Sequence, residues 1–334
     1  MSSLILSRAI ENFCDKQVST YITDRFNDGY GIPKDMKFDK GTLVVCADLG
    51  SGESKNKFER IINETGIAPV IIDHHEMGDD LNPNYKYLLN FNAFTKHEGY
   101  KKEYDIPDYC TSGLAFKIYF QMYKQLFVEN KTMLDAYVEA GLETQYRTMQ
   151  AFASIGTIAD MVSVNSICDD NKKIILDGFR AMEGNNLEYG AHYLIKNICK
   201  ADVEHMTTEK VQFSIAPVIN SAGRMTPNGG QIIFNALNAD TKEEIKEGLD
   251  KLRSLNNKRK EAVRKIEESS SYAKEISKSS GVYVNEDIPQ GIIGIIAQKL
   301  VKETGRPYVV ITKPDVQENK EYIASARNAE GYPS

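Results

Sequence analysis

Short apolar runs alternate with longer amphipathic stretches in the first part of the chain. Residues 42–47 and 69–72 are runs of the first kind, rich in β-branched side chains, which is typical of buried parallel strands. Residues 54–65, between them, have one apolar helical face and end at Gly66, a common helix stop. This order predicts a β-α-β unit whose strands are parallel and joined by a right-handed crossover.

The same patterns predict elements on both sides of this unit. The expected helices lie at 3–14, from Thr111 onward, and at 133–160, 171–183 and 190–199, and the expected strands at 19–22 and 87–92. Residues 220–224 are small and polar, which favours a turn.

Residues 241–279 contain no proline and a single glycine, Gly248, so we predict one long, strongly charged helix. Strand and helix patterns resume after it, at 282–284, 295–303, 308–311 and 323–327. The expected fold is α/β: a parallel sheet flanked by helices, a long connecting helix, and a smaller, truncated second α/β lobe. The expected boundaries are 1–240, 241–280 and 281–334.

The composition is that of an ordinary globular protein, with 41% apolar and 26% charged residues. No apolar run approaches the roughly 18–20 residues that span a bilayer. No basic segment precedes an apolar core at the N-terminus, so we expect no membrane segment, no signal peptide and a cytoplasmic protein. Five scattered cysteines argue against disulfides and a cysteine metal site. With a net charge of −6, any nucleic-acid contact must rest on local basic clusters.

Polar side chains follow both strands of the β-α-β unit. Asp48 comes directly after the first strand, and Asp73, His74 and His75 follow the second. The carboxyl ends of parallel strands form the edge where open α/β sheets bind ligands, and adjacent strands lie about 4.8 Å apart. We therefore expect these side chains to meet.

Asp160, near the end of the predicted helix 133–160, completes the candidate site. Mixed carboxylate and imidazole ligands suit Mn²⁺ or Mg²⁺ better than Zn²⁺ or iron. The alternative is that Asp73 and one histidine only cap the strand end. The pairing with Asp48 at a neighbouring strand end counts against that alternative.

The triplet Asp73-His74-His75 is the signature of the DHH phosphoesterase superfamily, and further motifs resemble its RecJ branch, the single-strand-specific 5′→3′ DNA exonucleases. These motifs are Arg25-Phe26-Asn27-Asp28-Gly29-Tyr30-Gly31, Gly156-Thr157-Ile158-Ala159-Asp160-Met161-Val162, Asn220-Ser221-Ala222-Gly223-Arg224, Gly291-Ile292-Ile293-Gly294-Ile295 and Gly305-Arg306-Pro307. The last two resemble the second, DHHA1-type lobe of that branch. The matches are collinear from Ser3 to Arg327, so the resemblance covers nearly the whole chain.

The resemblance implies a role for each candidate. Asp48 would bridge two metals, while His74 and Asp160 would bind one of them. His75 would contact the scissile phosphate or orient the site, with Asp73 in the same catalytic group. Two Mn²⁺ or Mg²⁺ ions about 3.5–4 Å apart would hold the attacking and leaving oxygens at phosphorus.

The sequence departs from the family pattern at several points. The first family motif, Asp-x-Asp-Gly, should lie just before Ser2-Ser3 and is absent, and the second lobe stops before a Gly-Gly-His segment. Leu49 stands where Asn or Cys is usual, and Pro289 where His is typical. The resemblance therefore implies one nearly complete metal site, one incomplete site, and a complementing polypeptide as a source of the missing strand.

Basic residues outside this site have two interpretations. A lone arginine in a turn is usually a solvated surface residue, but the resemblance implies that Arg224, with Asn220, clamps a backbone phosphate near the metals. Seven cations lie between residues 251 and 265 against one acid, Glu261. This run is either a solvated helix face or a track for the phosphates of a single strand.

The second lobe contains the remaining candidates for substrate binding. Residues 290–294 open a helix with two glycines, Gly291 and Gly294. Their N–H groups either face an anion or form an ordinary strand-to-helix turn. Ser325 and Arg327, at a strand end, are expected to face the same cleft.

Three functions are compatible with these features. The leading hypothesis is a metal-dependent phosphodiesterase acting on single-stranded DNA, a RecJ-like 5′→3′ exonuclease in DNA repair or recombination. The second is a small-oligonucleotide phosphoesterase of the same superfamily, against which the long helix and the segment 220–224 argue. The third is a catalytically impaired DNA-binding or scaffold member, which the missing first motif favours.

Overall fold

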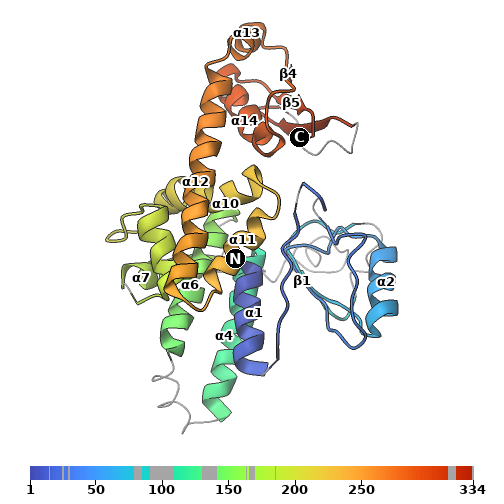
Figure 1. The fold of residues 1–334 in the computed structure, drawn as a ribbon, viewed down its shortest axis with the longest axis vertical. Coiled ribbons are helices and arrows are strands. Elements are labelled where there is room, and N and C mark those ends of the chain that lie inside the picture. The colour runs from blue at the N-terminus through green and yellow to red at the C-terminus, as the bar shows by residue number, and fades with distance from the viewer. Residues whose placement is uncertain are drawn as a thin grey trace.

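The β-α-β unit predicted from the sequence lies at one side of the first lobe (Figure 1). The computed structural model describes residues 1–14, 16–24, 26–28, 31–78, 85–90, 109–129 (side chains to 125), 141–162, 164, 170–184, 186–314 and 321–332. Strands β1 (Val45–Ala47) and β2 (Val70–Ile72) pair in parallel and are joined through α2 (Lys55–Thr65). Strand β3 (Leu88–Leu89) pairs in parallel with β2, giving the order β1-β2-β3. The predicted α/β fold is confirmed.

Helices cover both faces of this sheet (Figure 1). Cys46, Ile71 and Leu88 face α2 and form a small core with it. On the opposite face, Val45 and Ile72 pack against the main core, which includes α1 (Ser2–Cys14) and α4 (Thr111–Glu129). Burial on both faces explains why the strands are continuous apolar runs.

From residue 142 onward, the described part of the first lobe is mainly helical. It comprises α6 (Leu142–Ala159), α7 (Asp170–Glu183), α8 (Tyr189–His192), the π-helical η1 (Tyr193–Ile198), α9 (Thr208–Lys210), the π-helical η2 (Val211–Ile215), α10 (Ala216–Met225) and α11 (Gly229–Leu237).

A long helix, α12 (Lys242–Glu267), runs from the first lobe to the second (Figure 1). Its N-terminal half places Leu249 and Leu252 in the main core, and its C-terminal half places Val263 and Ile266 in the core of the second lobe. The prediction of one unbroken helix to residue 279 was wrong, because Ser269 adopts an extended conformation and caps a new helix.

The second lobe is a three-stranded sheet packed on helices. It comprises α13 (Ser270–Lys278), β4 (Val282–Val284), the 3₁₀ turn η3 (Gln290–Ile292), α14 (Ile293–Thr304), β5 (Tyr308–Thr312) and β6 (Ile323–Arg327). Strand β5 lies in the middle, parallel to β4 and antiparallel to β6. Tyr283, Tyr308 and Val310 point from the sheet into the core formed with α14.

Two further local predictions were wrong. Residues 19–22 form no strand, since the Ile22 N–H donates to the side chain of Gln231 (2.9 Å) instead of a neighbouring strand. Residues 220–224 lie within α10 and not in a turn, because Pro217 starts this helix and Ser221 and Ala222 are small enough to be buried. Arg25, Gly29 and Tyr30 lie outside the described residues.

None of the helices in the described part of the chain is both long enough and apolar enough to cross a bilayer.

Candidate metal centre

Asp48, His74 and Asp160 converge at the carboxyl edge of the first sheet. Asp48 follows β1 in the left-handed backbone region (φ 66°), and its N–H donates to the carbonyl of Ile72 at the end of β2 (3.0 Å). His74 follows β2, and Asp160 caps the C-terminus of α6. Residues far apart in the sequence thus meet where the two strands and the helix end, as the β-α-β pattern predicts for the first two.

The imidazole of His74 lies between two carboxylates. Its Nε2 is 2.8 Å from Oδ2 of Asp160, and its Nδ1 is 3.4 Å from Oδ1 of Asp48. Nδ1 also lies 3.0 Å from the hydroxyl of Thr111, the first residue of α4. A cation binds only one ring nitrogen, so one carboxylate remains free to hold the other and fix the tautomer.

This arrangement favours positive charge at His74. Burial opposes a charged imidazole, but hydrogen bonds to Asp160 and Asp48, and their negative charges, raise the pKa of His74 to about 10. Burial would raise the pKa of Asp48, but hydrogen bonds from His74 and Thr111 lower it below its usual value. Without metal, the site therefore binds a proton where a cation would otherwise bind.

The donor set fits a hard divalent cation. One ligand atom from each of Asp48, Asp73, His74 and His75 lies within 4.8 Å of the others. Ligands bound at about 2.1 Å in octahedral geometry are about 3 Å apart, close to the 2.8 Å between His74 Nε2 and Asp160 Oδ2. Carboxylate and imidazole donors of this kind suit Mn²⁺ or Mg²⁺.

Asp73 and His75 lie in different environments. The Asp73 side chain is completely buried, and its Oδ1 accepts from the N–H groups of His74 (2.8 Å) and His75 (3.3 Å) and lies 2.7 Å from His75 Nδ1. Its Oδ2 accepts from the Ser51 N–H (2.9 Å). The His75 ring is exposed and stacks on His74, with ring centroids 4.5 Å apart. His75 can therefore reach a bound molecule, whereas Asp73 holds the site from below.

A second group of predicted residues gathers at the start of α14. A Cβ on Gly294 would lie 3.0 Å from Nη2 of Arg327 and 3.2 Å from Oγ of Ser325. A guanidinium and a hydroxyl therefore lie beside the first turn of a 12-residue helix, where N–H groups favour an anion.

Arg224, Asn220 and Gly291 lie where α10 meets the second lobe. Asn220 is exposed, and Nη1 of Arg224 donates to the carbonyl of Gly291 (3.3 Å). Gly291 is buried directly against the main chain of Arg224, where a Cβ would collide with the Arg224 carbonyl oxygen. The structure thus gives Arg224 a contact between lobes that the sequence did not predict.

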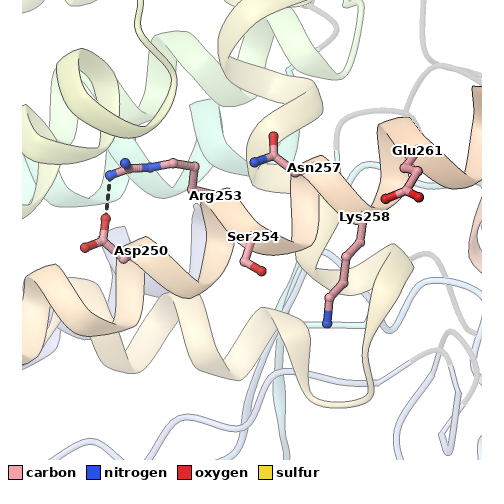
Figure 2. A pocket seen from close by; sticks show the side chains of 6 residues that line it. All are labelled: Asp250, Arg253, Ser254, Asn257, Lys258 and Glu261. Atoms are coloured by element: carbon pink, nitrogen blue, oxygen red, sulfur yellow. Dashed lines mark hydrogen bonds and ion pairs between the residues drawn. The ribbon is translucent and has the colours of Figure 1, made fainter.

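Four of the seven cations between residues 251 and 265 are paired with nearby acids. Lys251, Arg253, Arg264 and Lys265 each form an ion pair with an acid three or four residues away. Figure 2 shows a shallow hollow of about 340 Å³ on this helix, with the Arg253–Asp250 pair at one end. All six lining residues belong to α12, and none of them is a residue of the candidate metal centre. This favours the solvated-face interpretation of the basic run.

Three supporting residues were missed by the sequence reasoning: Thr111, Ser51 and Asn90. Thr111 contacts His74, while Ser51 and Asn90 bond to the Asp73-His75 segment. The signal for Asn90 was available, because it follows β3 directly, at the same edge of the sheet as Asp48 and Asp73.

Comparison with known proteins agrees with this geometry. Residues 1–141 match the model of the DHH family, N-terminal domain. The single-stranded-DNA-specific exonuclease RecJ of Bacillus subtilis (strain 168) is 27% identical over 95% of this chain and 36% of the relative. The protein of the same name from Haemophilus influenzae (strain ATCC 51907 / DSM 11121 / KW20 / Rd) is 23% identical over 94% of this chain and 52% of the relative. The chain thus spans about a third to a half of the length of these relatives.

Two solved structures share the fold. A crystal structure of exonuclease RecJ bound to manganese matches with a TM-score of 0.68 and 20% identity, over 93% of this chain and 72% of that one. RecJ from Thermus thermophilus in complex with Mn²⁺ matches with a TM-score of 0.65 and 18% identity, over 93% of this chain and 41% of that one.

The Asp-His-His edge lies within residues 1–141, the part of the chain that is similar to the DHH family, N-terminal domain. Over nearly its whole length, the chain is similar to RecJ exonucleases.

Proposed function

We propose that this chain is a metal-dependent phosphodiesterase that acts on single-stranded DNA from the 5′ end, in DNA repair or recombination. The observation that carries the proposal is the His74 imidazole held between the carboxylates of Asp160 and Asp48. Relatives of that name and metal-bound structures of the same fold support the substrate and the cofactor. The cofactor we propose is Mn²⁺ or Mg²⁺.

The proposed ligands are Asp48, His74 and Asp160. Asp160 lies beside Nε2 of His74, and Asp48 lies beside Nδ1, where the hydroxyl and N–H of Thr111 are also 3.0 and 3.2 Å away. When bound, the metal would supply Lewis-acid stabilisation of the charge that develops on the phosphoryl oxygens. Asp160 is half-exposed, so a cation can reach it without unfolding the edge.

His75 would contact the scissile phosphate, because its exposed ring stacks on His74 and faces outward. Asp73 would act as a positioning residue, since its buried carboxylate holds the His75 ring and the loop that follows Asp48. A hydrogen bond from the ring to Asp73 fixes the His75 tautomer and leaves Nε2 for the substrate.

The second lobe would bind the DNA backbone. Gly294, Ser325 and Arg327 form the proposed phosphate subsite at the start of α14, and Gly291 joins it to Arg224 and Asn220 of α10. We propose a division into a phosphoesterase domain (1–240), a connecting segment (241–280) and a DHHA1-like substrate-binding domain (281–334).

We also propose that a further strand with an Asp-x-Asp-Gly motif pairs with the outer edge of β1. Within the described residues, β1 pairs with β2 on one edge only, and its outer edge has no strand partner. An additional parallel strand there would end beside Asp48 and could add carboxylates to the site.

The test is cleavage of a single-stranded oligonucleotide with Mn²⁺, using 5′- and 3′-labelled copies of one sequence. We expect mononucleotides from the 5′ end, slower cleavage of the matched duplex, and no release by Asp160→Asn. Tight binding of the strand with no hydrolysis at any metal concentration would identify a scaffold protein instead. Faster hydrolysis of a dinucleotide than of the long strand would identify a small-oligonucleotide phosphoesterase.

A further inference from the structure

A closed ring of hydrogen bonds lies beneath the candidate metal centre. The amide nitrogen Nδ2 of Asn90 donates to Oγ of Ser51 (2.6 Å) and to the carbonyl oxygen of His75 (2.8 Å). The N–H of Ser51 donates to Oδ2 of Asp73 (2.9 Å), and Oδ1 of Asp73 lies 2.7 Å from Nδ1 of His75. The ring therefore returns to His75, having passed through the ends of all three strands.

Burial makes this ring costly to break. Ser51, Asp73 and Asn90 all have no exposed surface. A buried polar atom that loses its partner keeps the full cost of its desolvation, so each member is held by the others. His75 is the only member whose side chain is exposed, and its position follows from three residues that solvent does not reach.

We propose that Asn90 is a positioning residue that sets the direction of the His75 imidazole, an inference that rests on the proposed function. Asp73 holds the ring nitrogen, and Asn90 holds the main-chain carbonyl of the same residue. With its imidazole and its main-chain carbonyl both held, His75 projects in one direction from the sheet edge and stacks on His74. Asp73 also accepts from the His75 N–H (3.3 Å), so without Asn90 the peptide group that follows His75 is the part free to rotate and shift the imidazole.

The chemistry of the asparagine side chain explains the choice of residue. One amide nitrogen has two hydrogens, and here they meet two acceptors on different strand ends. Aspartate has almost the same shape but no hydrogen to donate, and it would place a charge against the His75 carbonyl. Serine has a single donor and a shorter reach.

The test compares Asn90→Asp and Asn90→Ala with two controls. Ser51→Ala removes one acceptor and leaves the bond to His75, and Asn171→Ala removes another fully buried asparagine, on α7. For both Asn90 variants we expect turnover on a single-stranded oligonucleotide to fall about 10–100-fold, as for other residues that orient a catalytic group. We expect KM to stay within about twofold, because the proposed phosphate subsite in the second lobe keeps its contacts. Asn171→Ala should retain turnover at temperatures below its unfolding transition.

A second readout does not depend on activity. The chain has five histidines, so selective ¹⁵N labelling resolves the His75 ring in the metal-free protein. We expect the His75 nitrogen shifts to move in both Asn90 variants and to stay in place in Asn171→Ala. Unmoved shifts, or equal turnover losses in Asn90→Ala and Asn171→Ala, would overturn the proposal. If the His75 shifts move in the Asn90 variants but the wild-type protein hydrolyses no DNA, the positioning role of Asn90 stands and the proposed function is rejected.

Discussion

The two sheets of this protein present their functional side chains in opposite ways. At the edge of the first sheet, the buried Asp73 accepts from three N–H groups and one imidazole, and His74 is held by groups from three other elements. In the second sheet, Arg327 is exposed, and the partners of its Nη1 are Ser325 and Ala326 of its own strand. The first site is held by several elements before any ligand arrives, whereas the Nη1 partners of the second site's cation belong to its own strand.

The difference follows from the ligand that each site would take. A small, strongly hydrated cation needs several ligands at fixed distances, and each must be held against its neighbours. A phosphate is larger, and its negative charge lies on its outer oxygens. One exposed guanidinium and a helix N-terminus can therefore bind it. We therefore expect substitutions in the first sheet to abolish chemistry and those in the second to weaken binding.

The largest expected effect is that of Asp160→Ala. Loss of the carboxylate beside His74 Nε2 should lower Mn²⁺-dependent cleavage by at least about 100-fold, because the cation loses a direct ligand. Cleavage of a 5′-labelled strand and circular dichroism of the same samples check the effect and the fold. Turnover equal to wild type would remove Asp160 from the site.

Asp48→Asn sharpens the first half of the comparison. The amide can still bond to the imidazole of His74 but carries no charge, so it separates metal ligation from positioning. If Asp48 is a metal ligand, the Asp48→Asn variant should bind Mn²⁺ about 10–100-fold more weakly than wild type, as measured by calorimetry. An unchanged affinity would mean that Asp48 only holds the His74 ring.

Arg327→Ala tests the second sheet. We expect an oligonucleotide with a 5′-phosphate to bind about tenfold more weakly, which corresponds to the loss of one charge-assisted contact. The Mn²⁺ affinity should not change, because Arg327 belongs to the other lobe. Arg306→Ala is the matched control, since this exposed arginine donates to the main chain of Ser279 and is not beside Gly294. Equal losses in both variants would count against a specific subsite.

The smallest effect concerns pH and the metal-free protein. His74 has its pKa raised from 6.5 to about 10, so its proton stabilises the folded state fully below pH 6.5, and this contribution is lost as pH rises toward 10. The melting temperature should therefore fall over this range more steeply in wild type than in His74→Asn, with His205→Gln as an exposed control. Saturating Mn²⁺ should remove the difference, because the cation replaces the proton. If the melting temperature of His74→Asn falls with pH as steeply as that of wild type, the pH dependence arises from other groups.

The sequence predicted the first sheet well because its signals are local and repeated. The strands are short apolar runs, a glycine ends α2 in the left-handed conformation, and the polar residues follow directly. The convergence of Asp48 with His74 needed only the rule for parallel strands. The meeting with Asp160 came from the family resemblance, because no local pattern relates the end of α6 to the end of β2.

The errors arose where tertiary contacts decide the local structure. Asn220 to Arg224 have turn-like composition, yet small side chains at Ser221 and Ala222 are also what a buried helix needs. The break between α12 and α13 depends on the conformation of one serine, Ser269. The ring through Asn90 could not be derived from spacing, since it joins main-chain and side-chain atoms of three strand ends.

The backbone of Asp48 limits how this position can vary. With φ at 66°, it occupies a region that strongly favours glycine, asparagine and aspartate over other residues. Glutamate would keep the negative charge but meet a steric penalty, and glycine would relax the turn but remove the ligand. Asparagine alone would preserve the local geometry, at the loss of one unit of charge. Natural sequence drift at this site would therefore pass through uncharged side chains, so that an inactive lineage could keep the architecture long after its chemistry had gone.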